Sequence, residues 1–120
     1  MNNCTAIFKW SNLAAPRIVV EPPSLQVVEG EPAEFRCEVA GNPPPQIEWV
    51  RVHGPMSPEV IIHNEILMFR STSKYDAAEY KCLAKNNVGL DERSVILHVQ
   101  GKHSVIKHFL FYRLKSKFHC

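Results

Sequence analysis

Four residues at fixed spacing restrict the possible fold of this chain more than any other feature of its sequence: Cys37, Trp49, Tyr80 and Cys82. Trp49 follows the first cysteine by twelve residues, and Tyr80 precedes the second by two, near the end of the run Asp76-Ala77-Ala78-Glu79-Tyr80-Lys81-Cys82. Cysteine, tryptophan and tyrosine each have a distinct packing or bonding role inside a protein. A chance match at all four positions would need four separate coincidences, so the set strongly restricts the fold.

The sequence around these residues has the pattern of short β-strands. Residues 33–39 alternate, with apolar side chains at Ala33, Phe35, Cys37 and Val39 and charged side chains between them. A period of two predicts a strand with one buried face. Clusters of proline, glycine and asparagine divide the remainder into further short strands, as in a β-sandwich. We expect strands near residues 18–20, 25–28, 33–39, 47–49, 60–62, 67–69, 78–84 and 95–99.

Residues 16–100 resemble an I-set immunoglobulin domain. Besides the four spaced residues, the resemblance rests on Leu67-Met68-Phe69, Ala84-Lys85-Asn86 and Gly89. Within that family the chain most resembles the perlecan-type tandem repeats of basement-membrane heparan sulfate proteoglycan. The similar segments there are the run from Val28 to Cys37, the loop after Trp49, and Leu97-His98-Val99-Gln100.

The resemblance implies an all-β, immunoglobulin-like fold: a two-sheet Greek-key sandwich of roughly 100 residues. It implies one inter-sheet disulfide between Cys37 and Cys82, with Trp49 packed over it. Tyr80 is placed for a tyrosine corner. The remaining expected core markers are Asp76 and Leu67.

Three positions depart from the family pattern. Ala78 stands where glycine is usual, and alanine is small enough to face the core there. Glu65 stands where the turn between strands D and E often has glycine, so we expect strain or another turn type. The arginine that commonly pairs with the aspartate before strand F has no counterpart between Val60 and Glu65. Asp76 is then left with a capping role alone.

The charge distribution excludes several classes of partner. The chain has a net charge of +2, but residues 16–100 carry eight Lys and Arg against twelve Asp and Glu, a balance of −4. Nucleic acid and heparin bind clustered basic residues, so neither is an expected ligand of this domain. No apolar run reaches the roughly 20 residues that span a bilayer, so membrane insertion is not expected either.

The two flanks do not follow the domain pattern. We expect residues 1–15 to lie outside the fold. Residues 101–120 form a basic tail, for which the alternatives are a disordered or amphipathic segment and translated non-coding sequence. The pair Gly101-Lys102 is what an unspliced donor site encodes in frame, which favours the last alternative. Cys4 and Cys120 lie in these flanks and are expected to be free.

No pattern of catalytic residues appears. Zinc needs close pairs of ligands, and the six histidines lack that spacing, so no metal and no cofactor is expected. Ser57, Ser71 and Ser73 lie in turns without the context of a nucleophile elbow. The sequence therefore predicts a protein without enzymatic activity. The histidines are His53, His63, His98, His103, His108 and His119.

One set of apolar residues is expected to point outward. If Trp49 and Cys82 face the core, strict alternation turns Val50, Val52, Leu83 and Ile96 to the outer face of the C–F–G sheet. Clustered exposed aliphatic side chains often mark a partner surface, although scattered ones are ordinary. This set is the candidate protein-binding face.

The sequence thus predicts a non-catalytic module of a multidomain, basement-membrane proteoglycan-like matrix protein. Its role would be that of a structural spacer and protein-binding unit, with matrix or cell-surface proteins and neighbouring immunoglobulin repeats as partners. We expect an extracellular location, with the signal peptide upstream of this fragment. One alternative is an ectodomain repeat of a cell-surface adhesion or signalling receptor. The other is an intracellular muscle module, whose cysteines stay reduced in the cytosol.

Overall fold

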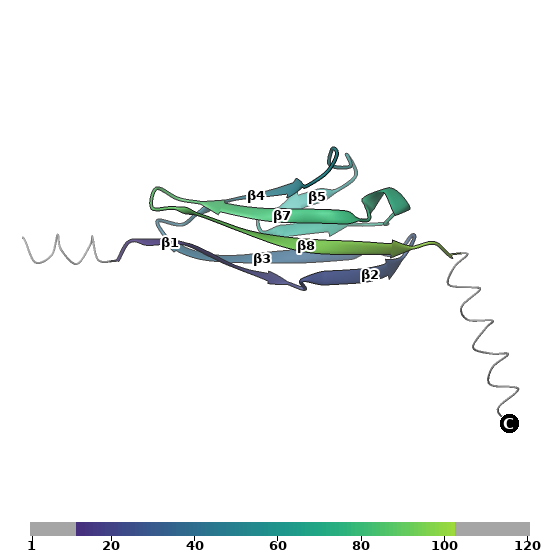
Figure 1. Cartoon of the computed structure of the whole chain (residues 1–120), viewed down its shortest axis with the longest axis horizontal. Coiled ribbons are helices and arrows are strands. Elements are labelled where there is room, and N and C mark those ends of the chain that lie inside the picture. The colour runs from purple at the N-terminus through teal and green to yellow at the C-terminus, as the bar shows by residue number, and fades with distance from the viewer. Residues whose placement is uncertain (1–11, 103–120) are drawn as a thin grey trace, which may run out of the picture.

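A computed structural model describes residues 12–102. Eight strands form two four-stranded sheets that pack face to face (Figure 1). A short 3-10 helix, η1 (Lys74–Asp76), lies between the sixth and seventh strands. The strands are β1 (Ala14–Glu21), β2 (Ser24–Val28), β3 (Ala33–Asn42), β4 (Gln46–Arg51), β5 (Ile61–His63), β6 (Ile66–Phe69), β7 (Ala78–Lys85) and β8 (Leu90–Gln100).

The strand order defines a Greek-key sandwich. One sheet has the order β1-β3-β6-β5 and the other β2-β8-β7-β4. The chain changes sheets at Pro22-Pro23, between β1 and β2, since proline cannot continue a hydrogen-bonded ladder. As a result β1 pairs antiparallel with β3, whereas β2 pairs parallel with β8. The predicted immunoglobulin-like two-sheet sandwich is confirmed.

The core lies between the two sheets and comes from alternate residues of each strand. Phe35, Leu67 and Val95 are completely buried, and the ring of Phe69 meets that of Tyr80 edge-on at 5.4 Å between centroids. Cys37 on β3 and Cys82 on β7 form the predicted disulfide, which joins the two sheets across this core. Covalent closure of the segment between them stabilises the fold by about 4 kcal/mol on the chain-entropy model.

Three observed features differ from or refine the sequence-based expectations. Strand β1 begins at Ala14, inside the segment expected to lie outside the fold, because Ala14 pairs with Asn42 of β3. Strand β5 is shifted by one residue, to Ile61–His63. In the following turn Asn64 adopts a φ of 53°, so Glu65 does not need the left-handed conformation that favours glycine. Ala78 packs against the core, as expected.

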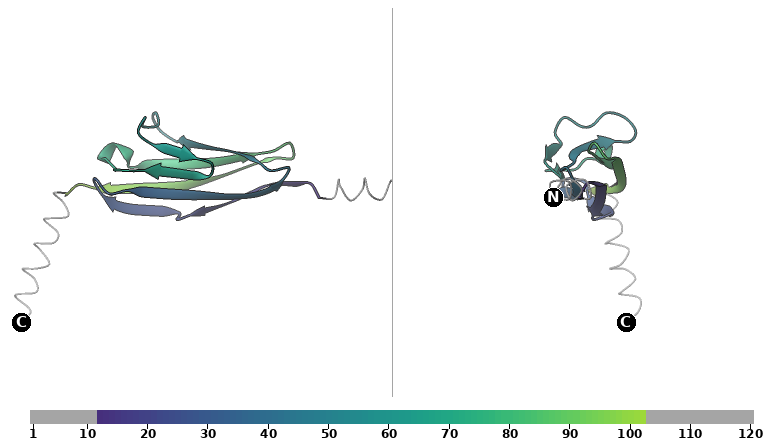
Figure 2. Two further views of the ribbon diagram at one scale, coloured as in Figure 1. Left: turned by 180° about the vertical axis from the view of Figure 1, so that it is seen from behind. Right: turned by 90° about the vertical axis from the view of Figure 1, so that its left-hand side faces the viewer.

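The described chain enters and leaves the sandwich at opposite ends (Figures 1 and 2). At one end lie the start of β1, the end of β3 and the turn between β7 and β8; we call this the N-terminal pole. At the other end lie η1, the end of β2 and the end of β8, which form the C-terminal pole. The outer faces of the two sheets therefore extend from the pole at which the described chain enters to the pole at which it leaves.

Candidate functional site

The disulfide lies under Trp49. This residue is opposite Cys82 in the β4–β7 ladder and is only 4% exposed. Its indole Nε1 donates a hydrogen bond of 3.2 Å to the carbonyl oxygen of Glu65, which also accepts one of 2.9 Å from the Cys37 amide. Because both cysteines are fully buried, their sulfurs serve the structure and are not accessible as nucleophiles.

Tyr80 and Asp76 close the corner between β6 and β7. The buried Tyr80 hydroxyl donates a hydrogen bond of 2.6 Å to the Asp76 carbonyl oxygen. Burial raises the pKa of Tyr80 to about 12, an effect that Arg51 opposes and Asp76 adds to. The Asp76 carboxylate accepts hydrogen bonds from the Ser73 amide (2.8 Å) and hydroxyl (3.3 Å). No ion pair involves Asp76 within residues 12–102, so its role there is capping.

The candidate binding face is on β4, β7 and β8, but charged residues separate its members. Val50, Val52 and Leu83 are half-buried, and only Ile96 is exposed, at 44%. Three of the four aliphatic residues have a charged neighbour across the ladder. Val50 pairs with Lys81, Leu83 pairs with Glu48 and Glu92, and Ile96 pairs with Glu79.

These charged neighbours also interact with one another. Lys81 forms a salt bridge of 3.4 Å with Glu92, diagonally across β7 and β8. The outer face is therefore a mixed surface, in which aliphatic side chains alternate with long charged ones. The composition of this face does not distinguish it from ordinary protein surface, because the cores of protein interfaces are depleted of Lys and Glu.

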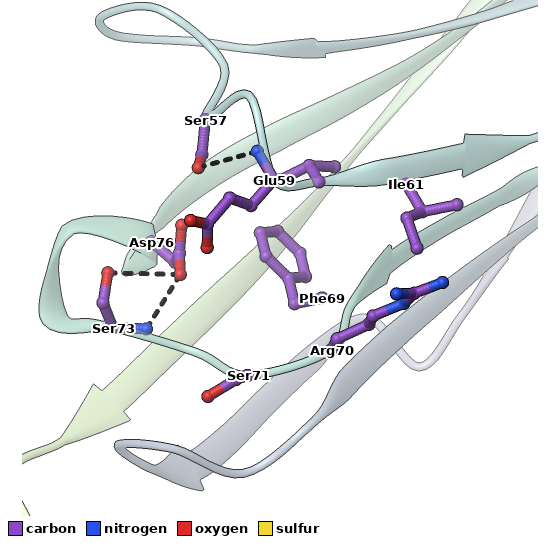
Figure 3. Close-up of a pocket in the computed structure, with 9 residues that line it drawn as sticks. Ser57, Glu59, Ile61, Phe69, Arg70, Ser71, Ser73 and Asp76 are labelled. Carbon is purple, nitrogen blue, oxygen red and sulfur yellow. Dashed lines mark hydrogen bonds between the residues drawn. The ribbon is translucent and has the colours of Figure 1, made fainter.

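A pocket of about 500 Å³ opens beside β6, between the loop before β5 and the segment before η1. In the view of Figure 3, Glu59 and Asp76 are on one side of the pocket and Arg70 is on the other. The lining has no histidine, so Ser57, Ser71 and Ser73 have no general base of that type. Its residues are Ser57, Glu59, Val60, Ile61, Phe69, Arg70, Ser71, Ser73 and Asp76.

Asn86, which the sequence placed only in a turn, organises the N-terminal pole. Its amide nitrogen donates to the carbonyl oxygens of Ala14 (2.8 Å) and Pro43 (3.0 Å). Its amide oxygen accepts from the backbone amides of Val88 (2.9 Å) and Gly89 (3.0 Å). Asparagine in a turn commonly forms hydrogen bonds with the backbone of the same turn, so the sequence could have predicted the bonds to Val88 and Gly89. The two long-range bonds depend on tertiary structure.

No group of three or more His, Cys, Asp and Glu side chains within residues 12–102 could hold a metal ion. None of the helices in the same range has the length and hydropathy needed to cross a membrane.

The fold, the buried disulfide and the tyrosine corner define an immunoglobulin-type sandwich. The family described as Immunoglobulin I-set domain matches residues 16–99, and the chain belongs to this family.

Two mouse proteins are examples of its relatives. The chain is 33% identical over 86 residues to basement membrane-specific heparan sulfate proteoglycan core protein, covering 72% of this chain and 2% of that protein. It is 37% identical over 98 residues to Roundabout homolog 1, covering 79% of this chain and 6% of that protein.

Among solved structures, the titin M3 domain is similar with a TM-score of 0.62 and 26% identity. The alignment covers 72% of this chain and 98% of that one. The predicted resemblance to I-set domains and to the proteoglycan repeats is thus confirmed.

Proposed function

We propose that this chain is a non-catalytic immunoglobulin module of a multidomain extracellular matrix protein of the basement-membrane proteoglycan type. It acts there as a structural spacer and as a protein-binding unit. The observation that carries the proposal is the position of chain entry and exit at opposite poles of a disulfide-bonded sandwich. Modules built in this way extend end to end and leave both sheet faces open to partners.

The relatives support this proposal in two respects. The chain spans only 2% to 6% of the length of the two curated relatives described above, so it corresponds to one small unit of each. The relative named as basement membrane-specific is a proteoglycan core protein. In addition, a disulfide between buried cysteines persists in oxidising compartments, which favours an extracellular location.

An ectodomain repeat of a cell-surface receptor is the second candidate. The similarity to Roundabout homolog 1 favours it, since that alignment is longer and more identical than the one to the proteoglycan. The spacer role would be the same, with a membrane anchor elsewhere in the parent protein.

An intracellular muscle module is the third candidate, and the similarity to the titin M3 domain favours it. In that setting the two cysteines would remain as thiols.

Fractionation of the source tissue separates the three candidates. An antibody against this chain would be used to follow the parent protein through a detergent-insoluble matrix fraction, a surface-biotinylated fraction and a cytosolic fraction. We expect the matrix fraction, with Cys37 and Cys82 of the denatured protein protected from alkylation until a reductant is added. Surface labelling of a detergent-soluble protein would favour the receptor. Cytosolic recovery of a protein whose two thiols, once it is denatured, are alkylated without reductant would favour the muscle module and contradict the matrix proposal.

A further inference from the structure

The pocket beside β6 contains a buried carboxylate whose hydrogen bonding is incomplete. Asp76 lines this pocket and is only 6% exposed. Both hydrogen bonds to its carboxylate, from the amide and the hydroxyl of Ser73, go to the same oxygen, Oδ2. The other oxygen, Oδ1, accepts no hydrogen bond from residues 12–102. Because an ionised carboxylate has about four acceptor positions, Asp76 keeps unused acceptor capacity at the pocket.

No basic side chain of the described residues balances the charge of Asp76. Arg51 is held elsewhere, since its guanidinium donates hydrogen bonds to the carbonyl oxygens of His53 and Tyr75. Arg70 lines the pocket but forms no ion pair within residues 12–102. A carboxylate that is withdrawn from water without a cation beside it is costly, so a cationic group that enters the pocket is favoured.

The walls of the pocket favour one type of cation. Its volume of about 500 Å³ lies within the range of roughly 300–1,000 Å³ that is usual for binding pockets. Val60, Ile61 and Phe69 give it apolar walls, and Glu59 adds a second carboxylate (Figure 3). A guanidinium is less strongly hydrated than an ammonium and bonds carboxylates through paired N–H donors. The methylene groups of an arginine also pack well on apolar surface.

We propose that this pocket binds an arginine side chain of a protein partner. Asp76 and Glu59 accept hydrogen bonds from its guanidinium, and Val60, Ile61 and Phe69 contact its methylene groups. The inference rests on the protein-binding part of the proposed function, because another protein supplies the arginine. Arginine is enriched among the few residues that carry most of the binding energy of an interface, so this pocket is the anchoring point of the contact.

An NMR titration of the 120-residue chain with glycyl-arginyl-glycine, blocked at both termini, tests the site. We expect saturable shifts of the Ser73 and Asp76 amides with a Kd of about 1 mM, because one side chain makes few contacts. The same peptide with citrulline has the shape of the arginine peptide without its charge. It should cause no saturable shift up to about 10 mM.

Two variants test the carboxylates separately. Asp76→Asn removes the charge and keeps an oxygen for the Ser73 amide, and it should abolish saturable binding. Because Asp76 also caps η1, Glu59→Lys gives an independent test at an exposed position where the fold does not depend on the side chain. It should weaken peptide binding at least about tenfold.

Glu38→Lys is the matched control, since Glu38 is an exposed glutamate of β3 that does not line the pocket. The change in net charge is the same as in Glu59→Lys, but at about 0.15 M salt a distant charge is screened, so the Kd should stay within about twofold. Equal weakening by these two changes would overturn the site, because overall charge would then explain the binding.

The other outcomes separate this inference from the function on which it rests. Equal shifts with the citrulline peptide, or no saturable shift with the arginine peptide, would overturn the pocket as an arginine site. Neither result would alter the fractionation experiment, so the matrix proposal would stand. Conversely, cytosolic recovery of the parent protein would contradict the matrix proposal and leave the pocket unaffected.

Discussion

The Tyr80 hydroxyl donates a hydrogen bond of 2.6 Å to the carbonyl oxygen of Asp76, four residues earlier in the chain. The carboxylate of the same aspartate caps the amide of Ser73, which precedes η1. One residue thus receives a bond from the following strand through its backbone and a bond from the preceding loop through its side chain. Asp76 thus links the segment before η1 to strand β7, within the connection between β6 and β7.

Replacing Tyr80 by phenylalanine should destabilise the domain by about 1–3 kcal/mol, because the buried Asp76 carbonyl loses its partner while the aromatic ring is kept. Urea unfolding of the full chain measures this cost. Tyr75→Phe is the matched control, since the exposed Tyr75 hydroxyl bonds only the Pro55 carbonyl and its loss should cost less than about 0.5 kcal/mol. Equal losses in the two variants would contradict the special role of Tyr80.

The stability of the domain should fall at alkaline pH through Tyr80. Its folded-state pKa of about 12 is above the ordinary value of 10.0, so the fold favours the neutral phenol. The contribution is fully present below pH 10 and is lost as the pH rises through about 12. Unfolding midpoints measured between pH 9 and 12 should therefore drop more steeply for the native chain than for Tyr80→Phe. If the unfolding midpoints of the two proteins fall equally with pH, ionisation of Tyr80 is not the cause of the alkaline loss of stability.

Reduction of the Cys37–Cys82 disulfide should lower the free energy of unfolding by about 2–5 kcal/mol. Denaturant titrations with and without reductant give the value, and a Cys37→Ala, Cys82→Ala chain, which also lacks the bridge, should be less stable still because it loses two buried sulfur atoms. Mass mapping of a non-reduced digest should find only this pair. A bridge from Cys4 or Cys120 to either buried cysteine would show that the assignment is incomplete.

Leu83 tests the character of the candidate binding face. It is half-buried and has Glu48 and Glu92 as neighbours across the ladder, so a third carboxylate there is repelled. We expect Leu83→Asp to be less stable than Leu83→Lys by a few tenths of a kcal/mol up to about 1 kcal/mol, with both variants folded. Circular dichroism and urea titration are sufficient. If either variant unfolds, Leu83 belongs to the core; if Leu83→Asp is the more stable, the pairing with the two glutamates is wrong.

Heparin binding by the full chain should depend on the basic tail and not on the domain. Residues 16–100 have a net charge of −4 and five basic residues follow them, namely Lys102, Lys107, Arg113, Lys115 and Lys117. Changing these five to glutamine should abolish any retention on a heparin column at physiological salt. Retention of that variant would mean that the domain itself has a binding surface that its net charge conceals.

Local patterns in the sequence were sufficient for the core and insufficient for the outer surface. The alternation at residues 33–39 gives the facing of Phe35 and Cys37 directly, because a strand turns successive side chains to opposite faces. The neighbours of Val50 and Leu83 depend instead on the register between β4, β7 and β8, which no single strand encodes. This is why the expected apolar cluster is in fact interleaved with Glu48, Lys81 and Glu79.

Two local features also required the structure. Strain or another turn type was expected at Glu65, where glycine is common, and the structure has the left-handed conformation one residue earlier, at Asn64, since asparagine tolerates it well. The bonds from Asn86 to Ala14 and Pro43 cross 72 and 43 residues of sequence. The acceptors are backbone carbonyl oxygens, which every residue has, so the side chains of Ala14 and Pro43 do not mark them as partners of Asn86.

The parallel pairing of β2 with β8 has a mechanical consequence. Tension applied between the two poles pulls β2 and β8 along their own axes in opposite directions, so the bonds between them are loaded in shear. Five residue pairs, from Ser24–Ile96 to Val28–Gln100, must then yield together and cannot peel apart one by one. Even after that rupture, the disulfide keeps the segment between Cys37 and Cys82, which are 45 positions apart in the sequence, from being extended. A stretched module would therefore lengthen only through the residues before Cys37 and after Cys82.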